Sequence, residues 1–199
     1  MNMNVLRSSF VLYIFLTIIT GIVYPLFITG LSNAFFNHQA KGSLIEKNNR
    51  TVGSALIGQS ITEIKYFHGR PSTTTDTPYN ALASSGSNLA VNNPALHKLF
   101  ASRAEQIKMF NNQNNVAVPV DLITASASGL DPHISPSAAY YQAGRVAKAR
   151  RLALHKIRHL IAANTERPFL SFLGQPVINV LKLNIALDAL EQSENAKIQ

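Results

Sequence analysis

The stretch FVLYIFLTIITGIVYPLFITGL, residues 10–31, is the longest apolar run of the sequence and decides how the chain is organised. No charged side chain occurs between Ser8 and Asn37. As a helix, these 22 residues extend about 33 Å at about 1.5 Å per residue. That length matches the hydrocarbon core of a bilayer, which is about 30 Å thick. We therefore predict an N-terminal segment 1–36 with a transmembrane anchor over about 10–31, followed by a soluble domain of residues 37–199.

A cleavable signal peptide is the main alternative for this segment. Arg7 would end its basic leader region, and Ser32-Asn33-Ala34 loosely resembles a cleavage site of small residues. The apolar core of a signal peptide, however, spans only about 7–15 residues. Because the run found here is longer, a retained anchor is favoured.

Small and hydroxyl-bearing side chains recur along the run at helical spacing. They are Thr17, Thr20, Gly21 and Tyr24, continued by Ile28. Small residues let two helices approach closely in lipid, which favours packing against a larger membrane partner. Pro25 removes one backbone donor, a loss that a neighbouring helix or a threonine hydroxyl would compensate. Gly and Pro are also simply more frequent in membrane helices, and the sequence leaves both interpretations open.

The rest of the chain, about 165 residues, is long enough for one ordinary domain with its own core. It carries all 10 acidic residues and every Lys and Arg except Arg7, within a chain of formal net charge +8. A basic surface suits nucleic acid, anionic lipid or an acidic protein, and the anchor favours lipid head groups or partner subunits over nucleic acid. The absence of cysteine excludes disulfides and thiolate metal sites.

Periodicity and capping residues predict an α+β domain with a small sheet and two main helices. Strands are expected over residues 51–57, 116–123 and 177–183, helices over 94–110, 137–163 and 184–190, and an irregular stretch over 69–94. Expected helix starts are Asn93-Pro94, Asp131-Pro132, Ser135-Pro136 and Asn184, because Asn, Asp and Ser cap helices well and Pro suits the first turn. The tract Asn-Asn-Gln-Asn-Asn, residues 111–115, is expected to be an exposed loop.

Two basic or glycine-containing stretches suggest binding sites. Residues 53–60, GSALIGQS, resemble a phosphate-binding loop, but Gln59 stands where that motif requires lysine, so a strand followed by a turn is favoured. From Arg145 to His159 there are six Lys and Arg residues and no acid, which favours contact with a partner over a merely solvated face. His155 and His159 lie in this stretch without the acid of an H-E-x-x-H motif, and no metal site is predicted.

The densest polar cluster contains Asp121, Thr124, Ser126, Ser128, Asp131 and His133. It suggests an alternative function, a membrane-tethered extracytoplasmic hydrolase that uses Asp121, Ser126 or Ser128, and His133. Closeness in sequence does not bring a nucleophile into contact with its base, and no G-x-S-x-G motif is present. A hydrogen-bonded turn is therefore favoured, and no catalytic residue is predicted.

Ordered blocks over nearly the whole chain resemble one family, the C subunit of the Kdp potassium-transporting P-type ATPase. The blocks are Gly21-x-x-Tyr24-Pro25, residues 53–59, 66–72 (YFHGRPS), 79–80, 87–89, 93–94, 118–135 (VPVDLITASASGLDPHIS), 142, 145–150 and 180–187. Each block alone is moderately specific, and the ordered set is highly specific. Within the longest block we expect a structural motif made by Asp121, Thr124, Ser126, Ser128, Asp131, Pro132 and His133.

The resemblance implies a non-catalytic subunit of a pump that imports potassium at the expense of ATP. Its expected partners are the channel-like potassium-binding subunit, the ATP-hydrolysing P-type subunit and membrane lipid. The family is described as a catalytic chaperone that raises the ATP affinity of the hydrolysing subunit. No firmly bound cofactor is expected; ATP would be shared with that subunit, with Gln142, Arg145 and Lys148 as the nucleotide-associated residues. Potassium is the transported ion of the complex.

The expected location is the bacterial cytoplasmic (inner) membrane, crossed once. The chaperone role points to a cytoplasmic domain, whereas a rival picture places the domain outside, over the potassium entrance. The charges that flank the anchor settle neither, because large domains translocate largely regardless of charge. We expect an extracytoplasmic domain, since a single N-terminal anchor with little before it acts as an uncleaved export signal.

Overall fold

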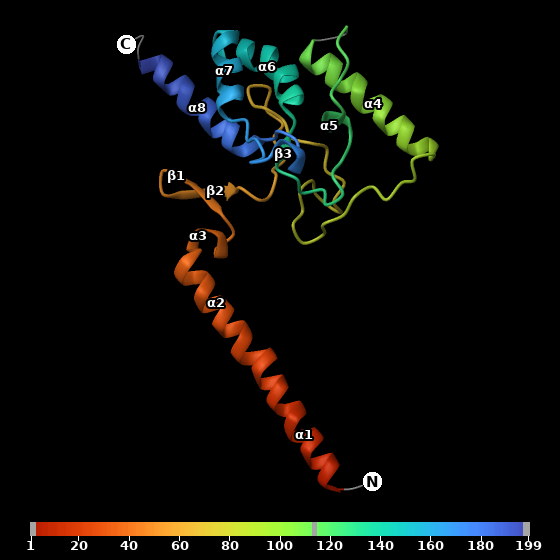
Figure 1. Ribbon diagram of the computed structural model, residues 1–199. Helices are drawn as coiled ribbons and strands as arrows, with labels where there is room; N and C mark the ends of the chain where they lie inside the picture. The colour runs from red at the N-terminus through yellow and green to blue at the C-terminus, as the bar shows by residue number, and fades with distance from the viewer. Residues whose placement is uncertain (1–2, 113–114, 197–199) are drawn as a thin grey trace. The chain divides into compact units, whose positions relative to one another are not determined.

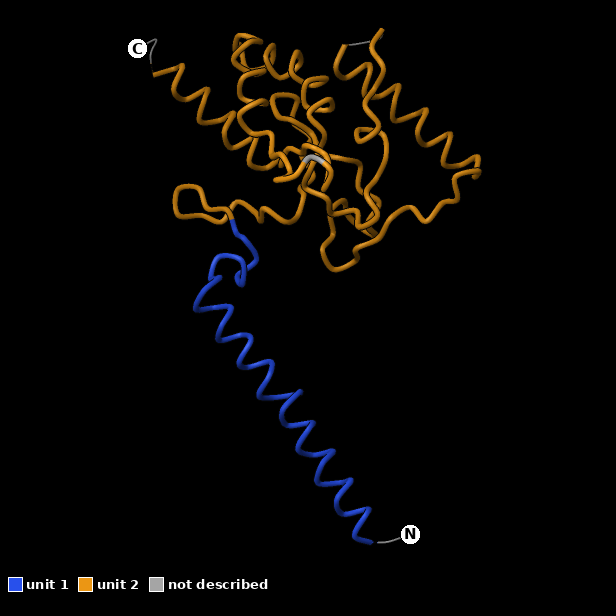
Figure 2. The backbone as a smooth tube through the Cα atoms, in the orientation of Figure 1, with its two compact units in different colours: residues 1–44 blue, residues 45–199 orange. Residues whose placement is uncertain are grey.

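The computed structural model describes residues 3–112 and 115–196 of the 199-residue chain. Its backbone divides into two compact units, residues 1–44 and residues 45–199, shown in different colours in Figure 2. The first unit is mainly helical, and the second holds a mixed helix and strand fold (Figure 1). The two units are described separately below.

The first unit confirms the predicted long helix. α1 (Met3–Ile18), the π-helix η1 (Ile19–Val23) and α2 (Tyr24–Phe35) follow one another without a break, and the short α3 (Asn37–Ala40) comes after them. The stretch Met3–Phe35 has 33 residues, a mean hydropathy of 2.3 and no buried part in its most apolar window. It is long and apolar enough to cross a membrane once, with its whole apolar surface exposed for lipid or a membrane partner.

The π-helical turn η1 ends at Val23, two residues before Pro25, and its position agrees with the chemistry of proline. Proline offers no backbone N–H, and its ring collides with the carbonyl group four residues earlier, here that of Gly21. Single π-helical turns inside α-helices and prolines both occur where the regular hydrogen-bond pattern is interrupted. The hydroxyls of Thr17 and Thr20 donate to the carbonyls of Tyr13 and Leu16, each at 2.8 Å. These polar groups are therefore satisfied within their own helix.

The second unit confirms the α+β class, with more long helices than the two expected. Its elements are β1 (Leu44–Lys47), β2 (Arg50–Ser54), α4 (Pro94–Asn111), α5 (Val120–Ile123), β3 (His133–Ile134), α6 (Pro136–Arg150), α7 (Leu154–Ala163), the 3₁₀-helix η2 (Ser171–Leu173), β4 (Ile178–Asn179) and α8 (Val180–Ala196). Strands β1 and β2 form one two-stranded sheet, and β3 and β4 form another. In the second sheet, which is antiparallel, His133 faces Asn179 and Ile134 faces Ile178.

The core lies where α6, α7 and α8 meet the second small sheet (Figure 1). Its fully buried side chains include Phe67, Ile134, Val146, Ile157, Ile161, Ile178, Leu183 and Leu187. Helix α6 contributes buried alanines, and their small size lets neighbouring backbones come close. Phe67 comes from the long segment 55–93, which contains no helix or strand. A segment without regular structure therefore supplies one of the largest core side chains.

Two predicted elements in the 116–135 region are wrong. Residues 116–123 do not form a strand, because Pro119 has no N–H for a ladder and stands instead as the N-terminal cap position of α5. Asp131-Pro132 does not start a helix. The Asp131 carboxylate accepts the N–H of His133 at 3.0 Å, and the carbonyl of Pro132 accepts the N–H of Val180 at 2.9 Å. These bonds direct the chain into β3.

The predicted helix over 137–163 is divided in two. Arg151 adopts a left-handed conformation with φ of 55°, and the N–H of Leu152 returns to the carbonyl of Ala147 at 3.0 Å. This C-terminal cap ends α6 and lets α7 fold back against it. The cap at Ser135 is confirmed, since its hydroxyl accepts the N–H of Ala138 at 3.1 Å. The cap at Asn93 is confirmed too, since its side chain accepts the N–H of Ala95 at 2.9 Å.

Two asparagines lie elsewhere than predicted. The strand expected over 177–183 ends at Asn179, whose side chain caps α8 by accepting the N–H of Lys182 at 3.1 Å. Asn184 therefore lies inside α8 and not at its start. Asn111, expected in an exposed loop, is the last residue of α4 and is buried, while Gln113 and Asn114 of that tract lie outside the described residues.

Replacing Asn184 with Ala tests the buried position of this amide. The side chain is 4% exposed and bonds both backbone groups of Phe67, so Asn184→Ala leaves a buried N–H and a buried C=O without partners. We expect the free energy of unfolding to fall by about 2–6 kcal/mol, at about 1–3 kcal/mol per orphaned group. Urea denaturation measures the loss.

Asn164→Ala is the matched control, because that amide donates to the carbonyl of Leu160 one turn earlier and, among the described residues, makes no further side-chain bond. Its loss should be within about 1 kcal/mol, the usual worth of one partly exposed bond. Equal losses in the two variants would contradict a special role for Asn184.

Candidate functional site

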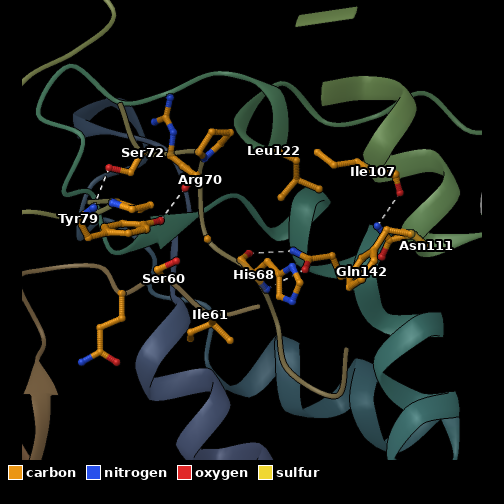
Figure 3. Close-up of a pocket in the computed structure, with 15 residues that line it drawn as sticks. Ser60, Ile61, His68, Arg70, Ser72, Tyr79, Ile107, Asn111, Leu122 and Gln142 are labelled. Carbon is orange, nitrogen blue, oxygen red and sulfur yellow. Dashed lines mark hydrogen bonds between the residues drawn. The ribbon is translucent and has the colours of Figure 1, made fainter. Parts of the chain in front are cut away.

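A cavity of about 280 Å³ lies in the second unit along the segment 68–72 (Figure 3). Its walls come from this segment, from the segment 59–61, from Pro78 and Tyr79, and from helices α4, α5 and α6. Many of these lining positions belong to the sequence blocks that suggested the family. The labelled lining residues in Figure 3 are Ser60, Ile61, His68, Arg70, Ser72, Tyr79, Ile107, Asn111, Leu122 and Gln142.

Two side-chain amides fix the backbone beneath this cavity. Gln142 of α6 accepts the N–H of His68 at 2.8 Å and donates to its carbonyl at 3.1 Å. Asn184 of α8 does the same for Phe67, with both distances 2.9 Å. An extended segment has no internal hydrogen bonds, so its buried polar groups need outside partners. Helices α6 and α8 provide them and hold two consecutive residues from both sides.

His68 is held in an uncharged form by this environment. Burial lowers the pKa of His68, and the hydrogen bond with the carbonyl of Glu63 at 3.0 Å opposes that shift only in part. The nearby positive charge of Arg145 lowers it further. The ring also lies against Phe110, with 5.0 Å between ring centroids. His68 therefore packs as a neutral aromatic ring at physiological pH.

The predicted nucleotide-associated residues separate into two kinds. Arg145 donates to Asn111 at 2.9 Å and to Gln142 at 2.8 Å, also bonds the carbonyl of Ile64, and lies over the ring of Phe110 at 4.7 Å. Burial lowers the pKa of Arg145 to about 10, which still leaves it charged at neutral pH. Lys148 is instead exposed, one turn further along α6. It lines a second, open cavity of about 1040 Å³ together with Arg145.

Asp131 is the centre of the polar cluster that the sequence indicated. Its carboxylate pairs with Arg70 at 3.2 Å and with the ring of His133 at 3.3 Å. The hydrogen bond from His133 is the main reason that the pKa of Asp131 lies below its usual range. Arg70 also donates to the hydroxyl of Thr124 at 3.3 Å and to the carbonyl of Ala125 at 3.3 Å. One ion pair thus joins the 66–72 block to the 118–135 block.

The close packing around Gly58 explains why the stretch that resembles a phosphate-binding loop has a glycine at this position. Its N–H donates to the carbonyl of Leu130 at 2.8 Å. A Cβ at this position would lie 2.4 Å from the ring of Tyr79 and 2.8 Å from the carbonyl oxygen of Asp131. Gln59 donates to the carbonyl of Val52 at 2.8 Å. The interpretation as strand β2 followed by a turn is confirmed, and the glycine serves close packing.

The residues of the hydrolase hypothesis do not assemble into a triad. The Asp121 carboxylate accepts the N–H of Ser135 at 2.6 Å, whereas His133 pairs with Asp131. Ser126 and Ser128 bond each other at 3.3 Å, and Ser128 also accepts the N–H of Leu130 at 3.1 Å. Among the hydrogen bonds of the described residues, none joins His133 to either serine. The arrangement is the hydrogen-bonded turn that the sequence favoured.

Sequence reasoning missed Arg70 and Tyr79 as members of this cluster. Tyr79 donates its hydroxyl to the carbonyl of Arg70 at 2.6 Å, and burial raises its pKa to about 12. Both residues belong to the family blocks, but they come from a stretch without periodicity, so no pattern placed them near Asp131. The roles of Gln142 and Asn184, whose amides bond the backbone of His68 and Phe67, could have been suspected from the sequence. Each is a polar residue among apolar helix positions.

Comparison with known proteins decides the family. Residues 6–189 match the family model described as K+-transporting ATPase, c chain. The chain belongs to the KdpC family. A relative from Photorhabdus laumondii named potassium-transporting ATPase KdpC subunit is 59% identical, over 95% of this chain and 98% of its own. KdpC subunits from Serratia proteamaculans and Polaromonas naphthalenivorans are 55% and 54% identical, over 100% and 96% of their lengths. The KdpC match includes the anchor as well as the domain.

The ion pair at Asp131 predicts how acid weakens this KdpC domain. Because the folded-state pKa of Asp131 lies below its usual value of 3.8, the carboxylate stabilises the fold above that value. This stability is lost as the pH falls through the folded pKa. Asp131→Asn should therefore lower the urea midpoint at pH 7 and reduce the difference between the midpoints at pH 7 and pH 3.

Asp76→Asn is the control for this prediction, because Asp76 is exposed and lies in a loop. Its urea midpoints should follow those of the unaltered chain at both pH values. If the two variants have the same acid dependence, the Asp131 ion pair does not contribute to stability.

Proposed function

We propose that this chain is the non-catalytic, single-pass C subunit of an ATP-driven potassium import pump in the bacterial inner membrane. Its partners are the channel-like potassium-binding subunit and the ATP-hydrolysing P-type subunit. The observation that carries the proposal is how the polar side chains of the family blocks are bonded. Their polar side chains bind backbone groups or one another and form a fixed scaffold, in a chain that also carries an apolar helix.

The bonding of the domain supports an accessory role. Gln142, Asn184 and Asp121 each bind buried or half-buried backbone, and Arg70 and Asp131 neutralise each other. General acid–base or nucleophilic catalysis needs such groups in contact with one another and open to a substrate. Side chains that bond backbone groups keep the shape of the domain constant. A constant shape favours binding to larger subunits.

The anchor supports assembly within the membrane. Residues 10–31 of this helix carry no charged side chain, and the hydroxyls of Thr17 and Thr20 are satisfied within the helix itself. Thr17, Thr20 and Gly21 carry small side chains or none, and a Cβ built on Gly21 would meet nothing within 4 Å. Such residues allow close packing with a membrane helix of a partner subunit.

We place the domain on the extracytoplasmic side. The chain then raises the ATP affinity of the hydrolysing subunit by stabilising one conformation of the assembled pump, as a catalytic chaperone that needs no nucleotide contact of its own. A coupling of this kind requires only that the chain bind one state of the pump more tightly than the other.

Removal of the chain from the pump tests this function. We expect ATP-driven potassium uptake to be lost in cells that lack the chain and restored when it is supplied again. The purified chain alone should hydrolyse neither ATP nor esters. The Asp76→Asn variant should restore uptake as well as the unaltered chain does. Full uptake without the chain would contradict the proposal.

The role of Lys148 separates a conformational effect on ATP from a shared nucleotide site. Lys148 is exposed, so Lys148→Ala leaves the buried contacts of Gln142 and Arg145 in place. We expect this variant to leave the KM for ATP of the assembled pump unchanged, whereas omission of the chain raises it. A raised KM in Lys148→Ala alone would indicate nucleotide beside α6 and a cytoplasmic domain. Protease added to intact cells reports the side directly.

A further inference from the structure

A short loop of the second unit exposes the most concentrated group of apolar side chains outside the anchor. Phe169, Leu170, Phe172 and Leu173 fall within five consecutive residues. Their exposed fractions are 98%, 42%, 79% and 65%. Single exposed apolar residues are normal on protein surfaces, but a contiguous group usually marks a binding surface.

The loop is held at its base and turned at its tip. Glu166 and Val177 exchange two backbone hydrogen bonds of 2.8 and 3.0 Å, which close the loop between them. At the tip, the N–H of Leu173 returns to the carbonyl of Leu170 at 2.9 Å, around the 3₁₀-helix η2. The apolar side chains therefore project from a closed turn and do not belong to a fraying strand.

The charges around the loop suit a lipid surface. No acidic residue occurs between Phe169 and Val177, and the nearest acid, Glu166, is paired with Lys182 at 2.8 Å. Arg167 is exposed beside the apolar tip, and within the described residues no ion pair neutralises it. Phe and Leu side chains next to an uncompensated cation are typical of segments that enter the boundary between head groups and acyl chains.

The covalent link to the anchor keeps a bilayer within reach. Eight residues, 36–43, separate α2 from β1. Fully extended, they span at most about 28 Å at about 3.5 Å per residue. A domain of about 155 residues has a radius of gyration of about 15 Å. The domain therefore stays within about its own diameter of the membrane surface, where the effective concentration of lipid is high.

We propose that the loop of residues 167–174 enters the surface of the bilayer that faces the domain, through Phe169, Leu170, Phe172 and Leu173. The loop then forms a second, reversible contact with lipid. Together with the anchor, it restricts the orientations that the domain adopts above the membrane. This proposal requires the anchor but not the pump function.

The absence of tryptophan from the chain makes a direct test available. Phe172→Trp places a single fluorophore on the loop, at a side chain that is mostly exposed. The control is Leu82→Trp, because Leu82 is 98% exposed on another loop and has no large apolar residue beside it in the sequence. Each full-length variant is reconstituted into vesicles of phosphatidylcholine and phosphatidylglycerol, and thermal unfolding checks that both are folded.

We expect the emission of Phe172→Trp to move to shorter wavelength in vesicles and to be quenched by brominated acyl chains, while Leu82→Trp stays solvent-exposed and unquenched. Equal, water-like emission from both variants would overturn the proposal. So would a shift of Phe172→Trp that occurs only after the other pump subunits are added, since the loop would then bind protein. Extraction of the chain by alkaline carbonate would instead signal failure of the anchor itself.

Discussion

The domain depends on one constraint, which is that an extended, irregular segment passes through its interior. Phe67 and His68 bury their backbone groups far from any strand partner, and each N–H and C=O is matched by a side-chain amide. An unpaired buried backbone group costs about 1–3 kcal/mol. The amides of Gln142 and Asn184 therefore decide that α6 and α8 approach this segment from two sides.

Charged groups strengthen the same arrangement. The side chain of Arg150 in α6 is 3% exposed and bonds Asp188 and Glu191 of α8. Asp188 also accepts a hydrogen bond from Lys47 of β1 at 3.0 Å. Tyr66, the residue before Phe67, lies beneath Arg150 at 4.5 Å. The hydrogen bonds from Lys47 and Arg150 outweigh burial and hold the pKa of Asp188 below its usual range. A buried cation left without its acids is strongly destabilising, so these contacts fix the relative positions of α6 and α8.

The hydrogen-bonded region around His68 and the exposed apolar loop of residues 167–174 suit different kinds of contact. The cavity above His68 is surrounded by groups that are already bonded, which suits a surface of constant shape. The loop around Phe172 is tied only at its base and carries side chains with no partner in the core. In a chain with its own membrane helix, a fixed scaffold and a lipid-seeking loop together limit how the domain is presented to neighbouring subunits.

Sequence alone determined the features that depend on residues close together in the chain or on the order of motifs along it. The anchor follows from an uninterrupted apolar length, the caps at Asn93 and Ser135 from side chains that bond the next turn, and the family from ordered blocks. Periodicity failed where a proline or a left-handed residue redirected the chain, as at Pro119 and Arg151. Tertiary structure alone decided which polar residues meet. Gln142 lies 74 residues from His68 in the chain, and Asn184 lies 117 from Phe67. No local pattern encodes such pairs, because they form only when packing removes water from both partners.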